Sequence, residues 1–85
     1  MSADEVCRFS SLGTSYILYV NRLEIRSPGL KPKREVISYR NITTLEKPAF
    51  LNRLDVKTND GKTHKLSLMD PADTARLKER LESLL

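Results

Sequence analysis

The pattern of hydrophobic and polar residues changes once along the chain, from strand-like alternation to a helical stripe. Short apolar or alternating segments span residues 6–10, 16–20, 23–27, 34–39, 42–46, 51–58 and 62–68. Segments of this length and pattern are typical of β-strands. Leu77, Leu81 and Leu84 then follow at the spacing of one helix face. We therefore predict a mainly β chain with one C-terminal helix.

Turn-forming residues separate the strand-like segments. Asn21-Arg22 is expected to join two strands in a tight hairpin, because Asn tolerates the positive φ of such a turn. Two prolines and a glycine make residues 27–33 a loop. Asn59-Asp60-Gly61, between two alternating runs, is the strongest hairpin signal. This regular punctuation predicts an antiparallel sandwich or barrel of six or seven strands.

The start of the helix carries three matching signals. Asp70 suits the N-cap, Pro71 suits the first helical position, and Asp73 lies in the first turn, where the helix dipole favours an anion. We expect a helix over about residues 71–85, with its leucine stripe covering one end of a barrel. Residues 1–85 are then a single domain, with strands over about residues 6–68.

The net charge of +4 is concentrated in one segment. Between Arg22 and Arg40 there are six basic residues and two acidic ones. The basic residues are Arg22, Arg26, Lys31, Lys33, Arg34 and Arg40. Two interpretations remain open, a solvated connection that carries charge for solubility and a weak anion-binding patch.

Residues suited to catalysis or metal binding are scarce. Cys7 is the single cysteine and falls in a predicted strand, where we expect a small buried or half-buried filler. His64 is the single histidine and is expected at the edge of the core. We predict no enzyme activity, no metal site, no cofactor and no small-molecule substrate. The acidic N-terminus lacks a secretory pattern, and no apolar run approaches the length that spans a bilayer, so we expect a cytoplasmic protein.

Two segments resemble the pleckstrin-homology-like (PH-like) fold, in particular the short bacterial PH domains. Residues 17–26 are similar to a tight hairpin of that family, and residues 36–46 to its pattern of strand, polar turn and Ile-Thr-Thr-Leu-Glu. The Asn59-Asp60-Gly61 hairpin and the leucine-rich helix follow, so that the resemblance covers residues 13–85. It implies a partly open antiparallel barrel plugged by the helix. It also implies a non-catalytic domain that binds lipid head groups, peptides or proteins, or self-assembles.

Protein–protein interaction, including self-association, is the leading hypothesis for function. Small open barrels have exposed sheet edges that accept a strand from a peptide or a second copy. Tyr16 is one candidate contact residue. Phe50, a large apolar residue in a predicted loop beside Pro48, either folds back into the core or contacts a partner.

Two alternatives depend on the basic segment. Arg26, Lys31, Lys33 and Arg34, with Leu30 at the loop tip, are candidates for weak binding to anionic membrane head groups, which would place the protein peripherally at the inner face of the membrane. Nucleic-acid binding on a barrel like the OB-fold is the less favoured alternative. It needs aromatic residues on one sheet face, whereas Tyr16 and Tyr19 have opposite parity in their strand.

Overall fold

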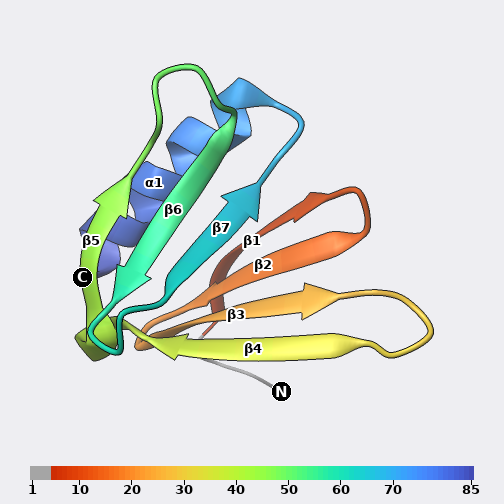
Figure 1. Cartoon of the computed structure of the whole chain (residues 1–85), viewed down its shortest axis with the longest axis horizontal. Coiled ribbons are helices and arrows are strands. Elements are labelled where there is room, and N and C mark those ends of the chain that lie inside the picture. Colours follow the sequence, from red (N-terminus) through yellow and green to blue (C-terminus); the bar gives the residue numbers. More distant parts are fainter. Residues whose placement is uncertain (1–4) are drawn as a thin grey trace.

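The computed structural model describes residues 5–85, which form seven strands followed by one helix (Figure 1). The elements are β1 (Glu5–Ser11), β2 (Thr14–Tyr19), β3 (Arg22–Ser27), β4 (Lys33–Ser38), the short 3-10 helix η1 (Tyr39–Asn41), β5 (Ile42–Glu46), β6 (Arg53–Thr58), β7 (Thr63–Ser67) and α1 (Pro71–Leu84). The predicted mainly β fold with one C-terminal helix is confirmed.

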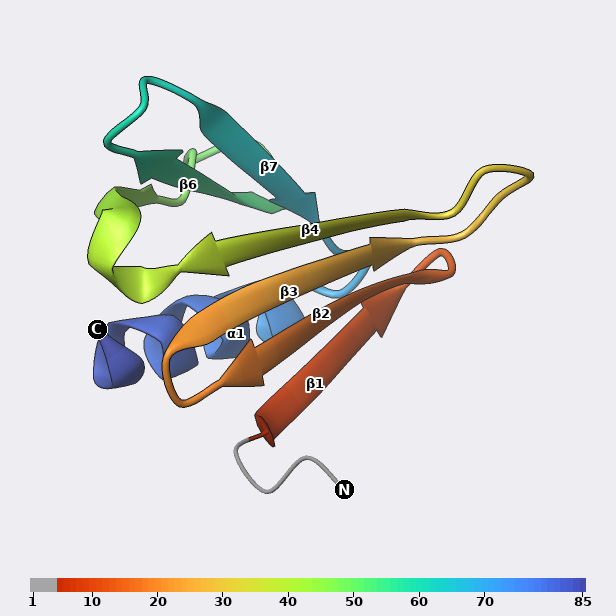
Figure 2. The same cartoon turned by 90° about the horizontal axis from the view of Figure 1, so that it is seen from below.

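The strands form two antiparallel sheets that face each other (Figure 2). One sheet has the order β1-β2-β3-β4 and the other the order β5-β6-β7. Within residues 5–85 no backbone ladder joins the two sheets, so β4 and β7 are edge strands at one opening, and β1 and β5 are edge strands at another. The structure is therefore the partly open barrel expected from the sequence.

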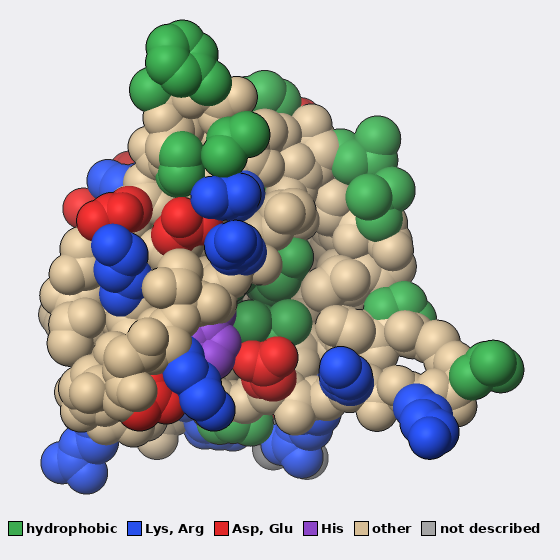
Figure 3. Space-filling model, in the orientation of Figure 1, with side chains coloured by type: hydrophobic (Ala, Val, Ile, Leu, Met, Phe, Trp, Pro, Cys, Tyr) green, Lys and Arg blue, Asp and Glu red, His purple; other side chains and the backbone are tan. Residues whose placement is uncertain are grey.

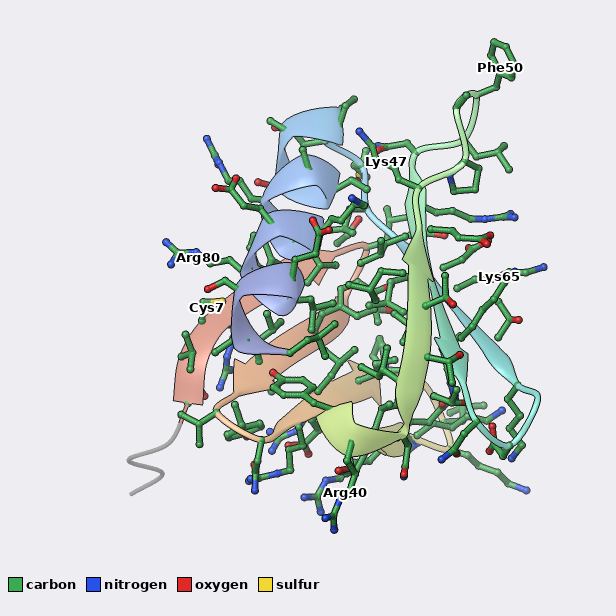
Figure 4. The ribbon with its side chains drawn as sticks, turned by 90° about the vertical axis from the view of Figure 1, so that its left-hand side faces the viewer. Cys7, Arg40, Lys47, Phe50, Lys65 and Arg80 are labelled. Atoms are coloured by element: carbon green, nitrogen blue, oxygen red, sulfur yellow. The ribbon has the colours of Figure 1, made fainter. Side chains whose placement is uncertain are left out.

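Helix α1 lies across the opening between β1 and β5 (Figure 4). Leu77 and Leu81 are fully buried, and Leu84 packs against the edge of the core. The Asp70 carboxylate accepts a hydrogen bond from the Ala72 backbone N–H at 2.9 Å, which is the N-cap geometry predicted. The helix thus closes one of the two openings of the barrel.

The core is built from the inner faces of both sheets, in the alternation that the sequence predicts. Leu54, Val56 and Leu66 are fully buried, and Leu68 is nearly so. The four-stranded sheet contributes Tyr16, Leu18, Leu23, Ile25 and Ile37. Because each buried aliphatic or aromatic side chain contributes about 1.5–3 kcal/mol, this shared core holds the two sheets together without a ladder between them.

The position of the tight hairpin differs from the expectation. The β2–β3 turn consists of Val20 and Asn21, Arg22 already belongs to β3, and Asn21 has no positive φ. Within residues 5–85, Leu12 is the non-glycine residue that has a positive φ, at 52°. The next residue in the chain, Gly13, also has a positive φ, at 86°. Positive φ at both central residues is the requirement of a type I′ turn. The turn that has this backbone conformation therefore joins β1 to β2 through Leu12 and Gly13. Its first central residue is a leucine, although Asn is favoured at that position.

Candidate functional site

The opening between β4 and β7 is a groove that α1 does not cover. Its wider part, about 600 Å³, is bounded by Glu35, Val36 and Ser38 of β4 and by Thr63 and His64 of β7. A second part of about 560 Å³ continues past Tyr16 and Lys65. The space-filling view shows the single histidine beside an acidic side chain in this hollow (Figure 3). The groove therefore separates two edge strands of different sheets.

The backbone of β4 has hydrogen-bonding groups directed away from its own sheet. The Tyr39 N–H donates to the Asn21 carbonyl at 3.2 Å, which fixes the hydrogen-bonded positions of the β3–β4 ladder. In an antiparallel pair these positions alternate. Arg34, Val36 and Ser38 consequently direct their N–H and C=O groups outward from the sheet edge. This edge can accept another strand.

The backbone of β7 is partly occupied along the equivalent edge. The Thr58 N–H donates to the Lys62 carbonyl at 3.1 Å, so Thr63, Lys65 and Ser67 direct their backbone groups away from β6. The Tyr16 hydroxyl donates to the Ser67 carbonyl at 3.0 Å and accepts from the Ser67 N–H at 3.1 Å. A side chain of β2 therefore takes the place of a strand at one end of β7.

This position corrects the expectation that Tyr16 contacts a partner. The side chain is 5% exposed and belongs to the core, and its hydroxyl is engaged with the other sheet. Burial raises the pKa of this hydroxyl, and the bond with the Ser67 backbone offsets only part of that rise. Tyr16 joins the two sheets and is not a surface residue.

One side-chain hydrogen bond crosses the groove from β7 to β4. The His64 Nδ1 atom of β7 lies 3.0 Å from the Glu35 Oε2 atom of β4. The side chain of His64 is 18% exposed. The side chain lies at the edge of the core, as the sequence predicted. Val36, the next residue of β4, is 51% exposed. The free edge of β4 therefore has an accessible apolar residue at its centre.

The predicted basic patch divides into two parts. Glu24, on the outer face of the four-stranded sheet, is 1% exposed and is bonded by Arg26 (Nε–Oε1, 3.0 Å) and by Arg34. Burial would raise the pKa of the Glu24 carboxyl, but hydrogen bonds from Arg26, Tyr19 and Arg34 lower it below its usual value. These two arginines neutralise a buried carboxylate and lie away from the loop tip.

The other part is the β3–β4 loop itself. Leu30 is fully exposed, and Lys31 and Lys33 beside it are exposed as well. Within the described part of the chain, neither lysine has an ion-pair partner. Of the five predicted anion-binding residues, Arg26 and Arg34 are paired with Glu24, although their side chains are 52% and 64% exposed, whereas these three lie unpaired at the loop.

Phe50 projects from the tip of the β5–β6 loop, with its side chain 99% exposed (Figure 4). The alternative in which it folds back into the core is therefore wrong. Its role as a contact residue stays a prediction. A pocket of about 240 Å³ lies under this loop, between Lys47 and Pro71.

Cys7 is half-buried and packs against the core beside α1, where the filler was expected (Figure 4). Burial raises the pKa of its thiol, and the nearby Arg80 guanidinium of α1 offsets part of that rise. A thiol with a raised pKa carries little reactive thiolate at neutral pH. The geometry gives this cysteine a packing role.

Within residues 5–85, no three His, Cys, Asp or Glu side chains gather into a group that could hold a metal ion. No helix in the same range is long and apolar enough to cross a bilayer. In comparisons with known proteins, no protein-family model and no curated protein matches the chain.

Three functional features were absent from the sequence prediction. Val36 was assigned to a strand but not to a free edge, because the edge depends on the order of strands in the sheet. Leu12 was placed in a connection without its positive φ. Glu24 alternates with Leu23 and Ile25 in the sequence, but its burial beneath two arginines from different strands has no local signal.

Proposed function

We propose that the chain is a non-catalytic assembly module that pairs with a second copy of itself along the edge of β4. The observation that carries this proposal is the row of outward backbone groups at Arg34, Val36 and Ser38. Unpaired edges of this kind are templates for strand addition. The occupant is inferred to be a second copy because the β4 sequence is complementary to itself.

The complementarity can be read from the antiparallel register centred on Val36. In that register, Val36 lies opposite the partner's Val36, and Arg34 lies opposite the partner's Ser38. All three outward residues of each copy then find hydrogen-bonding positions. Between them, Glu35 lies opposite the partner's Ile37, so no like charges face each other. A shift that placed Arg34 opposite the partner's Arg34 would be disfavoured by charge repulsion.

The resulting contact has two-fold symmetry and joins the four-stranded sheets of two copies into one continuous sheet. The same patch is used on both copies, as in most homodimers. The exposed valines supply an apolar contact at the centre, and the backbone supplies the hydrogen bonds. Because neither depends on ion pairs at the surface, we expect the dimer to persist at high salt.

The test is the solution mass by light scattering, over a range of protein concentrations and at low and high salt. We expect a concentration-dependent dimer whose dissociation constant changes little with salt. Val36→Lys places like charges opposite each other and should weaken the dimer at least about tenfold. Val6→Lys is the matched control, because Val6 is 42% exposed on β1 and lies outside the β4 edge.

Three outcomes contradict the proposal. A monomer at every concentration and salt would show that the edge of β4 does not pair with itself. A dimer that survives Val36→Lys would use another surface. A dimer lost equally in both valine variants would reflect added charge in general. Circular dichroism of each variant verifies that the exposed substitution leaves the fold intact.

A further inference from the structure

The connections at one end of the strands carry large exposed apolar side chains. This loop end comprises residues 12–13, 28–32, 47–52 and 68–70, which follow β1, β3, β5 and β7 and lie along one flank of the molecule (Figure 1). The exposed fractions are 81% for Leu12, 105% for Leu30, 99% for Phe50 and 71% for Met69. The space-filling view shows hydrophobic side chains along the same margin (Figure 3). Each connection of the loop end thus presents an apolar tip.

Direct contacts hold the four connections together. The Met69 N–H donates to the Ser11 hydroxyl at 3.0 Å, which joins the β7–α1 connection to the first hairpin. The Asn52 side-chain amide donates to the Met69 carbonyl at 2.9 Å, which joins the β5–β6 loop to the same connection. The β3–β4 loop approaches the first hairpin so closely that a Cβ atom at Gly13 would lie 3.0 Å from Pro28 Cγ. The apolar tips therefore belong to one organised surface.

Leu12 is a costly choice for folding. Its φ of 52° lies in the left-handed region, which bulky residues avoid and Asn tolerates. The side chain is 81% exposed, so it buries little within the chain in return. A strained residue that does not serve the core is a candidate for contact with something outside.

The charge of the loop end selects the kind of partner. Lys31 and Lys47 lie within its connections, Lys33 follows at the first residue of β4, and the acidic residue among them is Asp70. The Asp70 carboxylate is occupied as the helix cap. Apolar tips flanked by lysines match the two layers of an anionic membrane surface, the acyl boundary and the phosphate head groups.

We propose that the loop end docks on an anionic lipid bilayer. The apolar tips enter the interface, and Lys31, Lys33 and Lys47 lie against the phosphates. This surface is separate from the β4 edge, so it adds a second binding partner to the proposed assembly module. A bilayer is favoured over a second copy at this surface because the apolar residues stand on four separate tips. A bilayer accommodates such tips, whereas a protein partner needs a matching recess for each.

Vesicle binding tests the proposal directly, because the chain contains no tryptophan and a single one can be introduced as a reporter. Phe50→Trp should emit at shorter wavelength when vesicles of equal parts phosphatidylcholine and phosphatidylglycerol are added. Vesicles of phosphatidylcholine alone should give a weaker shift. Val20→Trp is the matched control, because Val20 is 56% exposed on the β2–β3 turn, at the opposite end of the strands. Its emission should change little.

Co-sedimentation with the same vesicles separates insertion from charge attraction. We expect Phe50→Ser to weaken binding at least about tenfold, because a buried aromatic side chain is lost. The double variant Lys31→Gln and Lys33→Gln should weaken it about 25-fold, at about a fivefold loss for each lysine. Arg40→Gln with Lys62→Gln, both exposed at the other end of the strands, is the charge-matched control.

Four results would overturn the proposal. The wild-type chain could fail to sediment with anionic vesicles at low salt. Phe50→Ser could bind like the wild type while the lysine variant is lost, which would indicate surface attraction without insertion. The control pair could weaken binding as much as the lysine pair. Finally, Phe50→Ser could change the solution mass, which would make the loop end a protein interface. Val36→Lys leaves the loop end unchanged, so a failure of self-pairing is distinguished from a failure of membrane docking.

Discussion

The two ends of the strands perform the same structural task with different residues. The loop end joins strands through connections with exposed leucine, phenylalanine and methionine side chains. The other end, here named the turn end, consists of residues 20–21, η1 and residues 59–62. Its connections are mainly polar and are joined by backbone bonds, such as the Asn59 N–H to the Asn41 carbonyl at 2.8 Å. Within the described residues, the turn end has one large exposed apolar residue, Val20.

The difference shows that joining these strands does not require exposed apolar residues. The turn end achieves it with backbone hydrogen bonds and polar side chains, and its labelled residue Arg40 lies far from Phe50 in Figure 4. The apolar tips of the loop end are therefore surplus to folding. A surplus of this kind on one surface is typical of an interaction site.

The largest expected difference between the ends concerns two asparagines. The Asn52 amide donates to the Leu68 carbonyl at 2.6 Å and to the Met69 carbonyl at 2.9 Å, and its oxygen accepts from the Thr74 hydroxyl at 2.6 Å. At about 1 kcal/mol for each bond, Asn52→Ala should lower the free energy of unfolding by about 3 kcal/mol. Urea denaturation measures this loss.

Asn59→Ala is the control at the turn end. Its side-chain amide lies 3.5 Å from the Asn41 side-chain oxygen at an exposed position, so the loss should stay below about 0.5 kcal/mol. Equal losses in the two variants would show that the side-chain bonds of the loop end do not organise it.

Two glycines with the same backbone conformation provide the next comparison. Gly13 and Gly61 both have a φ of 86°, but an added Cβ would meet Pro28 at 3.0 Å in the first case and nothing within 4 Å in the second. Gly61→Ala should lower the free energy of unfolding by about 1 kcal/mol through backbone strain alone. Gly13→Ala should lower it by about 2 kcal/mol, because the contact with Pro28 adds to that strain. Thermal unfolding of the two variants measures the difference. Equal falls in melting temperature would contradict the close packing of Gly13 against Pro28.

A smaller effect of opposite sign is expected at Leu12. Leu12→Asn relieves the positive φ of this position and should raise the free energy of unfolding by roughly 0.5–1 kcal/mol. The same change removes an apolar tip and should weaken vesicle binding. Urea denaturation and vesicle co-sedimentation of one protein preparation measure both quantities. A variant that is more stable and binds vesicles as before would remove Leu12 from the docking surface.

The last comparison concerns the pH dependence of stability and Tyr39 at the turn end. Burial raises the pKa of the Tyr39 hydroxyl from 10.0 to about 12, and the hydroxyl donates to the Tyr19 carbonyl at 2.6 Å. Because the folded state holds this proton more tightly, its contribution to stability is complete below pH 10.0 and is lost as the pH rises to about 12. Tyr39→Phe lacks that titration, so its urea midpoint should fall less over this window. Parallel declines in both proteins would contradict the assignment.

The sequence predicted those parts of the fold that depend on neighbours in the chain. The Asn59-Asp60-Gly61 hairpin, the alternation of Leu54 and Val56, and the Asp70 cap each have a local pattern, and all are confirmed. The bond from Tyr16 to Ser67 joins residues far apart in sequence, so no local pattern could indicate it. The burial of Glu24 likewise requires β3 and β4 to be paired.

The candidate surfaces were predicted less completely, for the same reason. Leu30, Lys31 and Phe50 were identified because their residue types are unusual or concentrated in loops. Leu12 and Met69 were not, because a single apolar residue in a connection is unremarkable until other connections lie beside it. The free edge of β4 depends on the sheet order, which the positions of strands in the sequence do not determine.

The Tyr16 hydroxyl also bears on how far an assembly of this protein can grow. A barrel with two open edges could add copies head to tail without limit and form fibres. Here α1 lies along the β1 and β5 side, and Tyr16 occupies the Ser67 end of β7. The unoccupied outward positions of β7 within the described chain are then Thr63 and Lys65, so the β4 edge, with Arg34, Val36 and Ser38, is the longer open one. A self-complementary edge of this kind is satisfied by one partner. One phenolic oxygen thus favours a closed pair over a polymer.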